Sequence, residues 1–251
     1  MRIRIPAAAG LLSLVGLAAL AQDPKADPKA LPADVVPSTF RMFLVTDGRF
    51  PPIKVAEGKE EPDPRDRTGK IHCLVCENGL APVVAVFVRA DAKTLGPDSG
   101  VAKLAKGLNT VIGDYRAYKV AGFVAFLRLE GGEKTIKLTA PDGTETTVTT
   151  DREYPDDEKR DGYAQDIRDF AAAIKTPDVP FGLAPEKSKA VSAWGIGDKD
   201  EVTVVAYYRM RTIAPPWRFA KAADLTDAKV NEILSTVVEK VTGKKKEAKK
   251  D

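Results

Sequence analysis

The first half of the chain contains two near-continuous runs of β-branched and aromatic residues, at 83–89 and 121–129. Such runs are typical of strands that are covered on both faces. Between them, residues 98–115 place apolar side chains at helical spacing, with Asp98 or Ser99 available to cap the helix. A strand, a helix and a strand in this order predict a right-handed crossover between parallel strands.

The second half predicts a helix, two antiparallel strands and a closing helix. Apolar residues share one helical face over 161–175, and residues 201–210 form a strand-like run. Residues 211–220 are expected to return as a second strand, with their Pro-Pro pair at an edge or a bulge. The closing helix, over 225–241 with Thr226 as its cap, carries an apolar stripe that would pack on the sheet: Val230, Ile233, Leu234, Val237, Val238 and Val241.

Shorter elements complete the pattern. Residues 40–50 predict a strand that enters a turn, and residues 179–184 are a further short strand candidate. Residues 133–150 alternate on either side of a Pro-Asp-Gly turn, which predicts an inserted β-hairpin. The segment 73–80 predicts a short helix that stops at Gly79. The acidic segment 152–161 is expected to be a solvated loop, because it lacks the glycine and the spacing of a calcium loop.

The two ends differ in composition from the rest. Residues 1–21 combine Arg2 and Arg4, an apolar run and a small-x-small ending, which predicts a secretory signal peptide rather than a retained membrane anchor. Residues 22–37 are expected to be a disordered linker and residues 244–251 a charged disordered tail. One domain over 38–243 is left. We therefore expect an exported protein, periplasmic or extracellular, with no stable membrane insertion.

Charge argues against a nucleic-acid partner. The formal net charge of +3 arises at the ends of the chain, from the two arginines of the leader and the five lysines of the tail. A nucleic-acid surface needs a clear basic excess on the folded domain. The body of this chain has none.

The segment GKIHCLVCENG, residues 69–79, holds both cysteines and the only histidine. If a helix begins near His72, Cys73 lies in its first turn, where free N–H groups and the helix dipole lower a thiol pKa. Cys76 would follow on the same face as the resolving thiol, and a protonated His72 could stabilise the Cys73 thiolate further. Outside the cytoplasm such a pair is often oxidised to a disulfide.

Other interpretations of the same segment stay open. The two cysteines could be a structural or vestigial pair, packed on one face with Leu80. A zinc site would need a fourth ligand beside His72, Cys73 and Cys76, and haem attachment would need a histidine where Glu77 stands. With no phosphate loop and no Ser-His-Asp set, the sequence predicts no cofactor and no metal.

The order of elements resembles the thioredoxin-like superfamily over roughly residues 38–242. PVVAVFVR (82–89) is similar to the first central strand, and AWGI (193–196) with EVTVVAYYRM and the following helix is similar to the second half. The resemblance is to secreted bacterial thioredoxin-like proteins. It implies an α/β, three-layer fold, with a central mixed β-sheet flanked by helices and the hairpin at about 133–150 as an insertion.

Two departures affect the chemistry. The family places its reactive C-x-x-C after the first central strand, where this chain reads ADAKTLGPDSG (90–100), and a cis-proline before its third central strand, where this chain reads GDKDEV (197–202). Here the C-x-x-C precedes the first central strand. By analogy it would lie near the opposite end of that strand from the usual active site.

Two functions follow from these patterns. The first is thiol–disulfide exchange or redox sensing by Cys73, Cys76 and His72, with other exported proteins that carry thiols or disulfides as partners. If the protein is an enzyme, it is then a thiol–disulfide oxidoreductase. The second is a non-catalytic binding or scaffold module that keeps the thioredoxin fold. No substrate and no oligomeric state is indicated.

Overall fold

The structure, a computed structural model, describes residues 35–36, 39–55, 59–129, 132–152 and 157–243. The predicted signal peptide (1–21), most of the predicted linker (22–37) and the predicted tail (244–251) lie outside these residues. Val36 is buried and donates its N–H to the Met210 carbonyl at 3.1 Å. At least one packed residue therefore lies inside the stretch predicted as a linker.

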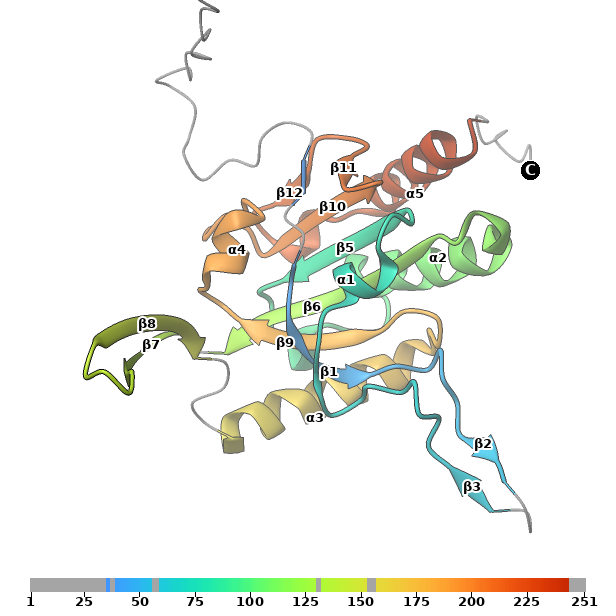
Figure 1. Cartoon of the computed structure of the whole chain (residues 1–251). Coiled ribbons are helices and arrows are strands. Elements are labelled where there is room, and N and C mark those ends of the chain that lie inside the picture. The colour runs from blue at the N-terminus through green and yellow to red at the C-terminus, as the bar shows by residue number, and fades with distance from the viewer. Residues whose placement is uncertain (1–34, 37–38, 56–58, 130–131, 153–156, 244–251) are drawn as a thin grey trace, which may run out of the picture.

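A mixed sheet forms the centre of the molecule (Figure 1). Its strands, in spatial order, are β11 (Arg211–Thr212), β10 (Val202–Tyr208), β5 (Val83–Val88), β6 (Ala121–Leu129), β9 (Phe181–Pro185), β1 (Met42–Thr46) and β4 (Ile71–His72), and β12 (Trp217–Phe219) also pairs with β10. The strands β5, β6 and β9 are parallel, whereas β10 and β1 run antiparallel to their neighbours.

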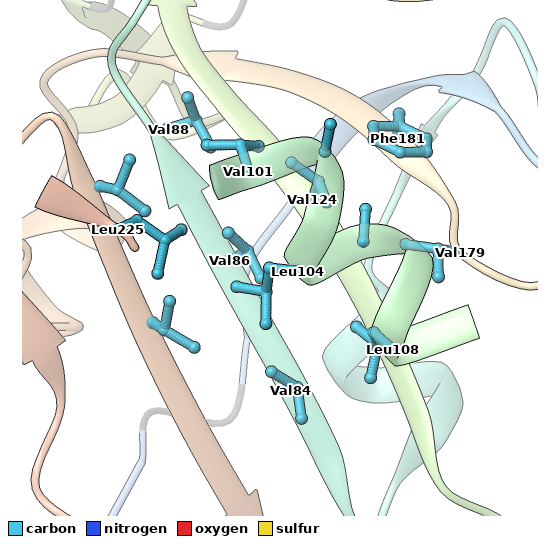
Figure 2. Close-up of a cluster of buried hydrophobic side chains, with 14 of the residues drawn as sticks. Val84, Val86, Val88, Val101, Leu104, Leu108, Val124, Val179, Phe181 and Leu225 are labelled. Carbon is cyan, nitrogen blue, oxygen red and sulfur yellow. The ribbon is translucent and has the colours of Figure 1, made fainter. Parts of the chain in front are cut away.

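Helices cover both faces of the sheet. Alternation along β5 sends Val84, Val86 and Val88 to one face, against α2 (Gly100–Asp114). Figure 2 shows these valines beneath Val101, Leu104 and Leu108 of that helix. The same face is covered by α3 (Asp157–Ile174) and α5 (Asp227–Thr242). The opposite face carries the short helices α1 (Leu74–Asn78) and α4 (Lys189–Ala193).

This arrangement confirms the predicted fold class. The crossover β5–α2–β6, the antiparallel β10 and the closing α5 form the thioredoxin-like three-layer architecture. The predicted hairpin is present as β7 (Gly132–Thr139) and β8 (Glu145–Arg152), which pair only with each other among the described residues. A second small hairpin joins β2 (Ile53–Lys54) and β3 (Glu60–Glu61).

Two local expectations needed correction, and a third, the cap of α5, was confirmed in its position only. The returning strand is split into β11 and β12, with Pro215 and Pro216 between them, because prolines cannot donate to the ladder. Thr226 occupies the N-cap of α5 without a side-chain hydrogen bond, whereas Ser99 accepts from the Ala102 N–H at the start of α2. The helix α3 begins at Asp157, so the end of the segment expected as a loop is helical.

Aromatic rings form the core beneath α4. Trp194 is fully buried and packs edge-on or tilted against Phe40, Phe87 and Tyr207, with ring centroids 6.1, 5.4 and 5.8 Å away. Its indole N–H donates to the Thr39 carbonyl at 3.3 Å. Trp194 therefore joins α4, the sheet and the segment before β1.

The buried hydroxyl of Tyr207 has no hydrogen-bond partner among the described residues. Burial raises the pKa of Tyr207, so the group remains a neutral phenol. Because an unsatisfied buried polar group costs about 1–3 kcal/mol, Tyr207→Phe is expected to leave the free energy of unfolding unchanged or to raise it by up to that amount. Urea denaturation measures this, and a clear loss of stability would show that the hydroxyl is bonded.

Candidate thiol–disulfide site

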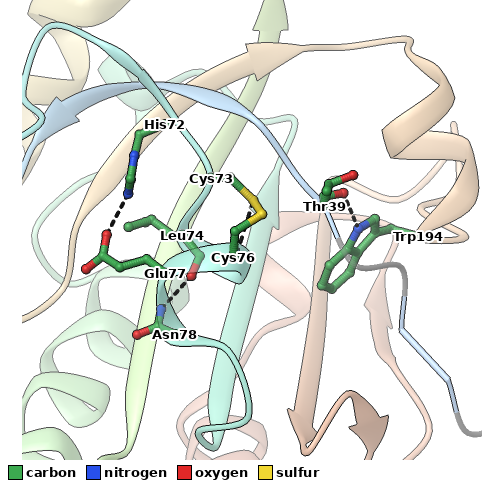
Figure 3. The surroundings of a disulfide bond; sticks show 8 residues. All are labelled: Thr39, His72, Cys73, Leu74, Cys76, Glu77, Asn78 and Trp194. Carbon is green, nitrogen blue, oxygen red and sulfur yellow. Dashed lines mark hydrogen bonds and ion pairs between the residues drawn. A yellow bond between two sulfur atoms is a disulfide. The ribbon is translucent and has the colours of Figure 1, made fainter.

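Cys73 and Cys76 form a disulfide at the start of α1, with their Cα atoms 5.3 Å apart (Figure 3). The strand β4 ends at His72, and Cys73 is the N-cap of α1 in an extended conformation. The backbone N–H of Cys76 donates to Cys73 Sγ at 3.2 Å. The helix thus begins at Leu74, one residue later than expected. Cys73 is therefore its N-cap and does not lie within its first turn.

The short helix α1 is held by two buried side chains on the sheet and by contacts at its C-terminal end. Leu74 and Val75 are buried in the aromatic face of the sheet. The Asn78 side chain donates to the Leu74 carbonyl at 2.8 Å, and Gly79 ends the helix at a φ of 53°, where a residue with a side chain would be strained. These contacts hold the disulfide segment in place on the sheet.

The two cysteines differ in exposure. Cys76 is exposed, whereas Cys73 is half-buried against the aromatic core. Figure 3 shows the disulfide on the side of α1 that faces Trp194 and Thr39. Cys76 is therefore the more accessible of the two cysteines to solvent. The hydrogen bond from the Cys76 N–H, in contrast, favours negative charge on Cys73.

His72 contacts a carboxylate and not the sulfur atoms. Its Nε2 lies 2.6 Å from Glu77 Oε2, and Arg49 Nη1 lies 2.9 Å from Glu77 Oε1. Arg49 in turn forms a bidentate pair with Asp47, at 2.7 and 2.6 Å. Glu77 is thus the partner that sequence reasoning missed, although its position directly after Cys76 and five residues from His72 was visible.

The position of the thiols in the sheet corrects the sequence-based expectation. The paired residues form one row across the sheet: Ile71, Phe43, Leu183, Phe126 and Val88. Because β4 runs in the same direction as β5, its end at His72 is level with the carboxyl end of β5. The expectation of the opposite end was therefore wrong: the thiols are displaced sideways across the sheet, and not to its other end.

The place where the family carries its cysteines is a polar cavity in this chain. It has a volume of about 500 Å³, and its lining includes Arg89, Asp91, Ser99, Arg128 and Glu201. The Arg89 side chain donates to the carbonyls of Gly197 and Glu186, at 3.2 and 3.0 Å. These bonds give Arg89 a structural role in joining the strand end to the two loops.

A smaller cavity adjoins the disulfide segment. Its volume is about 260 Å³, and it is lined by Phe50, Arg65, Arg67, His72 and Glu77. The guanidinium carbons of Arg49 and Arg65 lie 5.1 and 4.8 Å from the centroid of the Phe50 ring. Sequence reasoning missed this cavity; the signal was a repeated D-x-R pattern at 47–49 and 63–65, in which each arginine folds back on its own aspartate.

The second of these pairs predicts a pH dependence. Hydrogen bonds from the Arg65 side chain and backbone lower the pKa of Asp63 to about 2. Because this pKa lies below the value of about 3.9 in an unfolded chain, the ionised pair stabilises the loop above about pH 4, and that contribution is lost as the pH falls toward 2.

Arg65→Met is expected to raise the pKa of Asp63 toward its ordinary value, although the backbone hydrogen bond remains. A carboxyl NMR titration of Asp63 measures this. An unchanged pKa in the variant would contradict the assignment to the guanidinium.

The described residues contain no group of three or more His, Cys, Asp or Glu side chains that could hold a metal. In the same part of the chain, no helix is both long and apolar enough to cross a bilayer. Strand order and pairing define an α/β protein of thioredoxin-like architecture, with a C-x-x-C disulfide at the start of α1.

No family model matches the chain, and no curated protein matches its sequence. Among solved structures it is similar to an uncharacterized conserved protein from Geobacillus kaustophilus, at 12% identity and a TM-score of 0.47, with 88% of each chain covered. It is also similar to a protein from Bacteroides thetaiotaomicron provisionally described as a protein disulfide isomerase, at 12% identity and a TM-score of 0.43 (85% and 91% covered). A third is a protein from Chlorobium tepidum provisionally described as the thiol:disulfide interchange protein DsbE, at 13% identity and a TM-score of 0.42 (83% and 99% covered). The fold assignment above rests on strand order and pairing.

Proposed function

We propose that this protein carries out thiol–disulfide exchange through Cys73 and Cys76. The observation that carries the proposal is the hydrogen bond from the Cys76 N–H to Cys73 Sγ at the start of α1. In the reduced protein, such a donor stabilises a thiolate on Cys73, and the thiolate is the form that attacks. This argument assigns attack to Cys73 and resolution to Cys76.

The exchange can be written as two balanced steps. The Cys73 thiolate attacks one sulfur of a client disulfide, so that a mixed disulfide forms and the other client sulfur leaves as a thiolate. The Cys76 thiol then loses its proton and attacks Cys73 Sγ. The second client sulfur leaves as a thiolate, the Cys73–Cys76 disulfide forms, and two electrons have passed from the protein to the client.

His72 acts in this proposal as a positioning residue. His72 directly precedes Cys73, and Glu77 directly follows Cys76. The contact between His72 and Glu77 therefore joins the two residues that flank the C-x-x-C segment. Arg49 fixes Glu77 from a different part of the chain. The contacts of Glu77 with His72 and Arg49 would keep the two thiols close together after the disulfide is reduced.

We further propose that the protein works outside the cytoplasm. The leader-like residues 1–21 support this, and an oxidising compartment would suit a pair that cycles through a disulfide. Exported proteins with thiols or disulfides would then be the clients.

A trapping experiment tests the exchange. The reduced protein, freed of excess reductant, is mixed with a disulfide-bonded protein substrate to trap the intermediate. Turnover is measured separately with dithiothreitol as the sustaining dithiol, because dithiothreitol would reduce a trapped mixed disulfide. Cys76→Ser is expected to accumulate a mixed disulfide through Cys73, and Cys73→Ser is expected to lose both the trapped species and the turnover. Trapping on Cys76 instead would reverse the assignment of the two thiols.

Alkylation of the reduced protein separates exchange from the non-catalytic alternative. We expect Cys73 to react with iodoacetamide at a pH below the value of about 8.5 at which a free cysteine is half-ionised. Two thiols that resist alkylation in the folded protein, with no reduction of the substrate, would overturn the proposal in favour of a structural pair.

A further inference from the structure

The strand that leads into the disulfide lies at the edge of the sheet. β4 pairs with β1 on one side, and no strand borders its other side among the residues that the structure describes. The Leu44 N–H donates to the Lys70 carbonyl at 2.9 Å, so Lys70 directs its carbonyl inward. Because successive residues of a strand point their backbone groups to opposite edges, the N–H and C=O of Ile71 face outward.

An outward-facing strand edge can bind an extended polypeptide. Extended segments add to such edges by main-chain hydrogen bonds and place alternate side chains in neighbouring pockets. The side chain of Ile71 is itself 43% exposed. Cys73 follows Ile71 two residues later in the chain, so a segment paired with Ile71 would run toward the start of α1, where the disulfide lies.

The charged groups at the cavity lined by Phe50, Arg65, Arg67, His72 and Glu77 differ in their exposure to solvent and in their pairing. The Arg65 side chain is 69% exposed, whereas that of its partner Asp63 is only 4% exposed. Arg67 donates to the Pro64 carbonyl at 2.9 Å and has no carboxylate partner among the described residues. The carboxylate of Glu77 is already engaged by His72 and Arg49. The cavity therefore presents positive charge to an incoming group.

We infer that the client of this site is a polypeptide segment in extended conformation, bound along the outer edge of β4, with an acidic side chain in the cavity of Phe50, Arg65 and Arg67. Since residues i and i+2 of a strand share one face, the acidic residue and the client cysteine would be two positions apart. The inference rests on the proposed exchange reaction and specifies its substrate class.

Model peptides test the inference. Each carries one cysteine joined by a disulfide to a chromophoric thiol, and the Cys73 thiolate would displace that thiol as it forms a mixed disulfide with the peptide. The first peptide has aspartate two positions from the cysteine, and the second has asparagine there. A third has the aspartate and a single N-methyl group on the backbone amide expected to pair with Ile71.

The expected ranking is specific. The aspartate peptide should react about 3- to 5-fold faster than the asparagine peptide, as for one exposed ion pair, and the N-methyl peptide should also be slow. Replacing Arg65 and Arg67 together by glutamine should abolish the preference for aspartate. As a matched control, Lys103→Gln changes an exposed cation at the start of α2 and should leave the preference unchanged.

A symmetrical chromophoric disulfide without a peptide separates the two proposals. If it reacts normally while the three peptides react at equal rates, the client inference is overturned and the exchange reaction stands. If it fails to react with the reduced protein, the exchange reaction itself is overturned. A preference for aspartate that persists when Arg65 and Arg67 are both replaced by glutamine would place the acidic residue elsewhere and would also overturn the inference.

Discussion

Replacing Trp194 by alanine is expected to remove about 3–5 kcal/mol of the free energy of unfolding. The side chain is fully buried and contacts three aromatic rings, so the substitution leaves a large cavity in the core beneath α4. It also removes the indole N–H that Thr39 accepts, which leaves that carbonyl without this donor. Urea denaturation followed by circular dichroism measures the loss.

Two further variants define what Trp194 contributes. Trp194→Phe keeps a ring in the core and is expected to lose less than the alanine variant. Trp217→Ala removes the other tryptophan, which is only partly buried and donates to Glu232 at 3.1 Å, and its loss should also be smaller. Equal losses for Trp194→Ala and Trp217→Ala would contradict the central role given to Trp194.

Gly100→Ala is expected to destabilise the fold by about 1–3 kcal/mol. Gly100 is the first residue of α2, and a Cβ atom there would overlap the carbonyl oxygen of Leu225 in the loop before α5. Since that oxygen belongs to the backbone, it cannot rotate away as a side chain could. Either α2 or the loop before α5 must shift.

The same helix offers a matched control. A Cβ atom at Gly113 would meet no atom within 4 Å. Because alanine is a better helix former than glycine, Gly113→Ala is expected to raise the free energy of unfolding by up to about 1 kcal/mol. Urea midpoints of the two variants measure the difference, and losses of similar size would show that glycine is not required by the contact with Leu225.

The disulfide occupies a different part of the fold from the position that the family resemblance indicates. The carboxyl end of β5 carries hydrogen-bonded charged groups such as Arg89, which join loops together. The thiols lie instead beside an edge strand, with a cavity on the far side of His72 and Glu77. A client bound as inferred above would approach from the sheet edge.

The order of strands and helices was determined by the sequence, because each element buries a face that its own residues define. The runs at 83–89 and 121–129 had to be covered on both faces, and the periodic apolar residues of 98–115 supplied one cover. Local chemistry similarly defined the stop of α1 at Gly79 and the hairpin turn around Gly143, whose φ is 82°. These features depend on neighbours in the chain.

The surroundings of the disulfide depend on contacts between residues far apart in the chain, which the spacing of residues in the sequence cannot specify. The C-x-x-C motif was visible, but its level in the sheet followed from the register of β4 on β1, which links residues about thirty positions apart. Arg49 likewise reaches Glu77, the partner of His72, from the turn after β1.

The sequence by itself thus determined the fold class and the two thiols. The tertiary structure alone decided which groups surround those thiols and which strand edge lies open beside them. The physical reason is that burial patterns are periodic and local, whereas ion pairs and strand register join residues that only folding brings together.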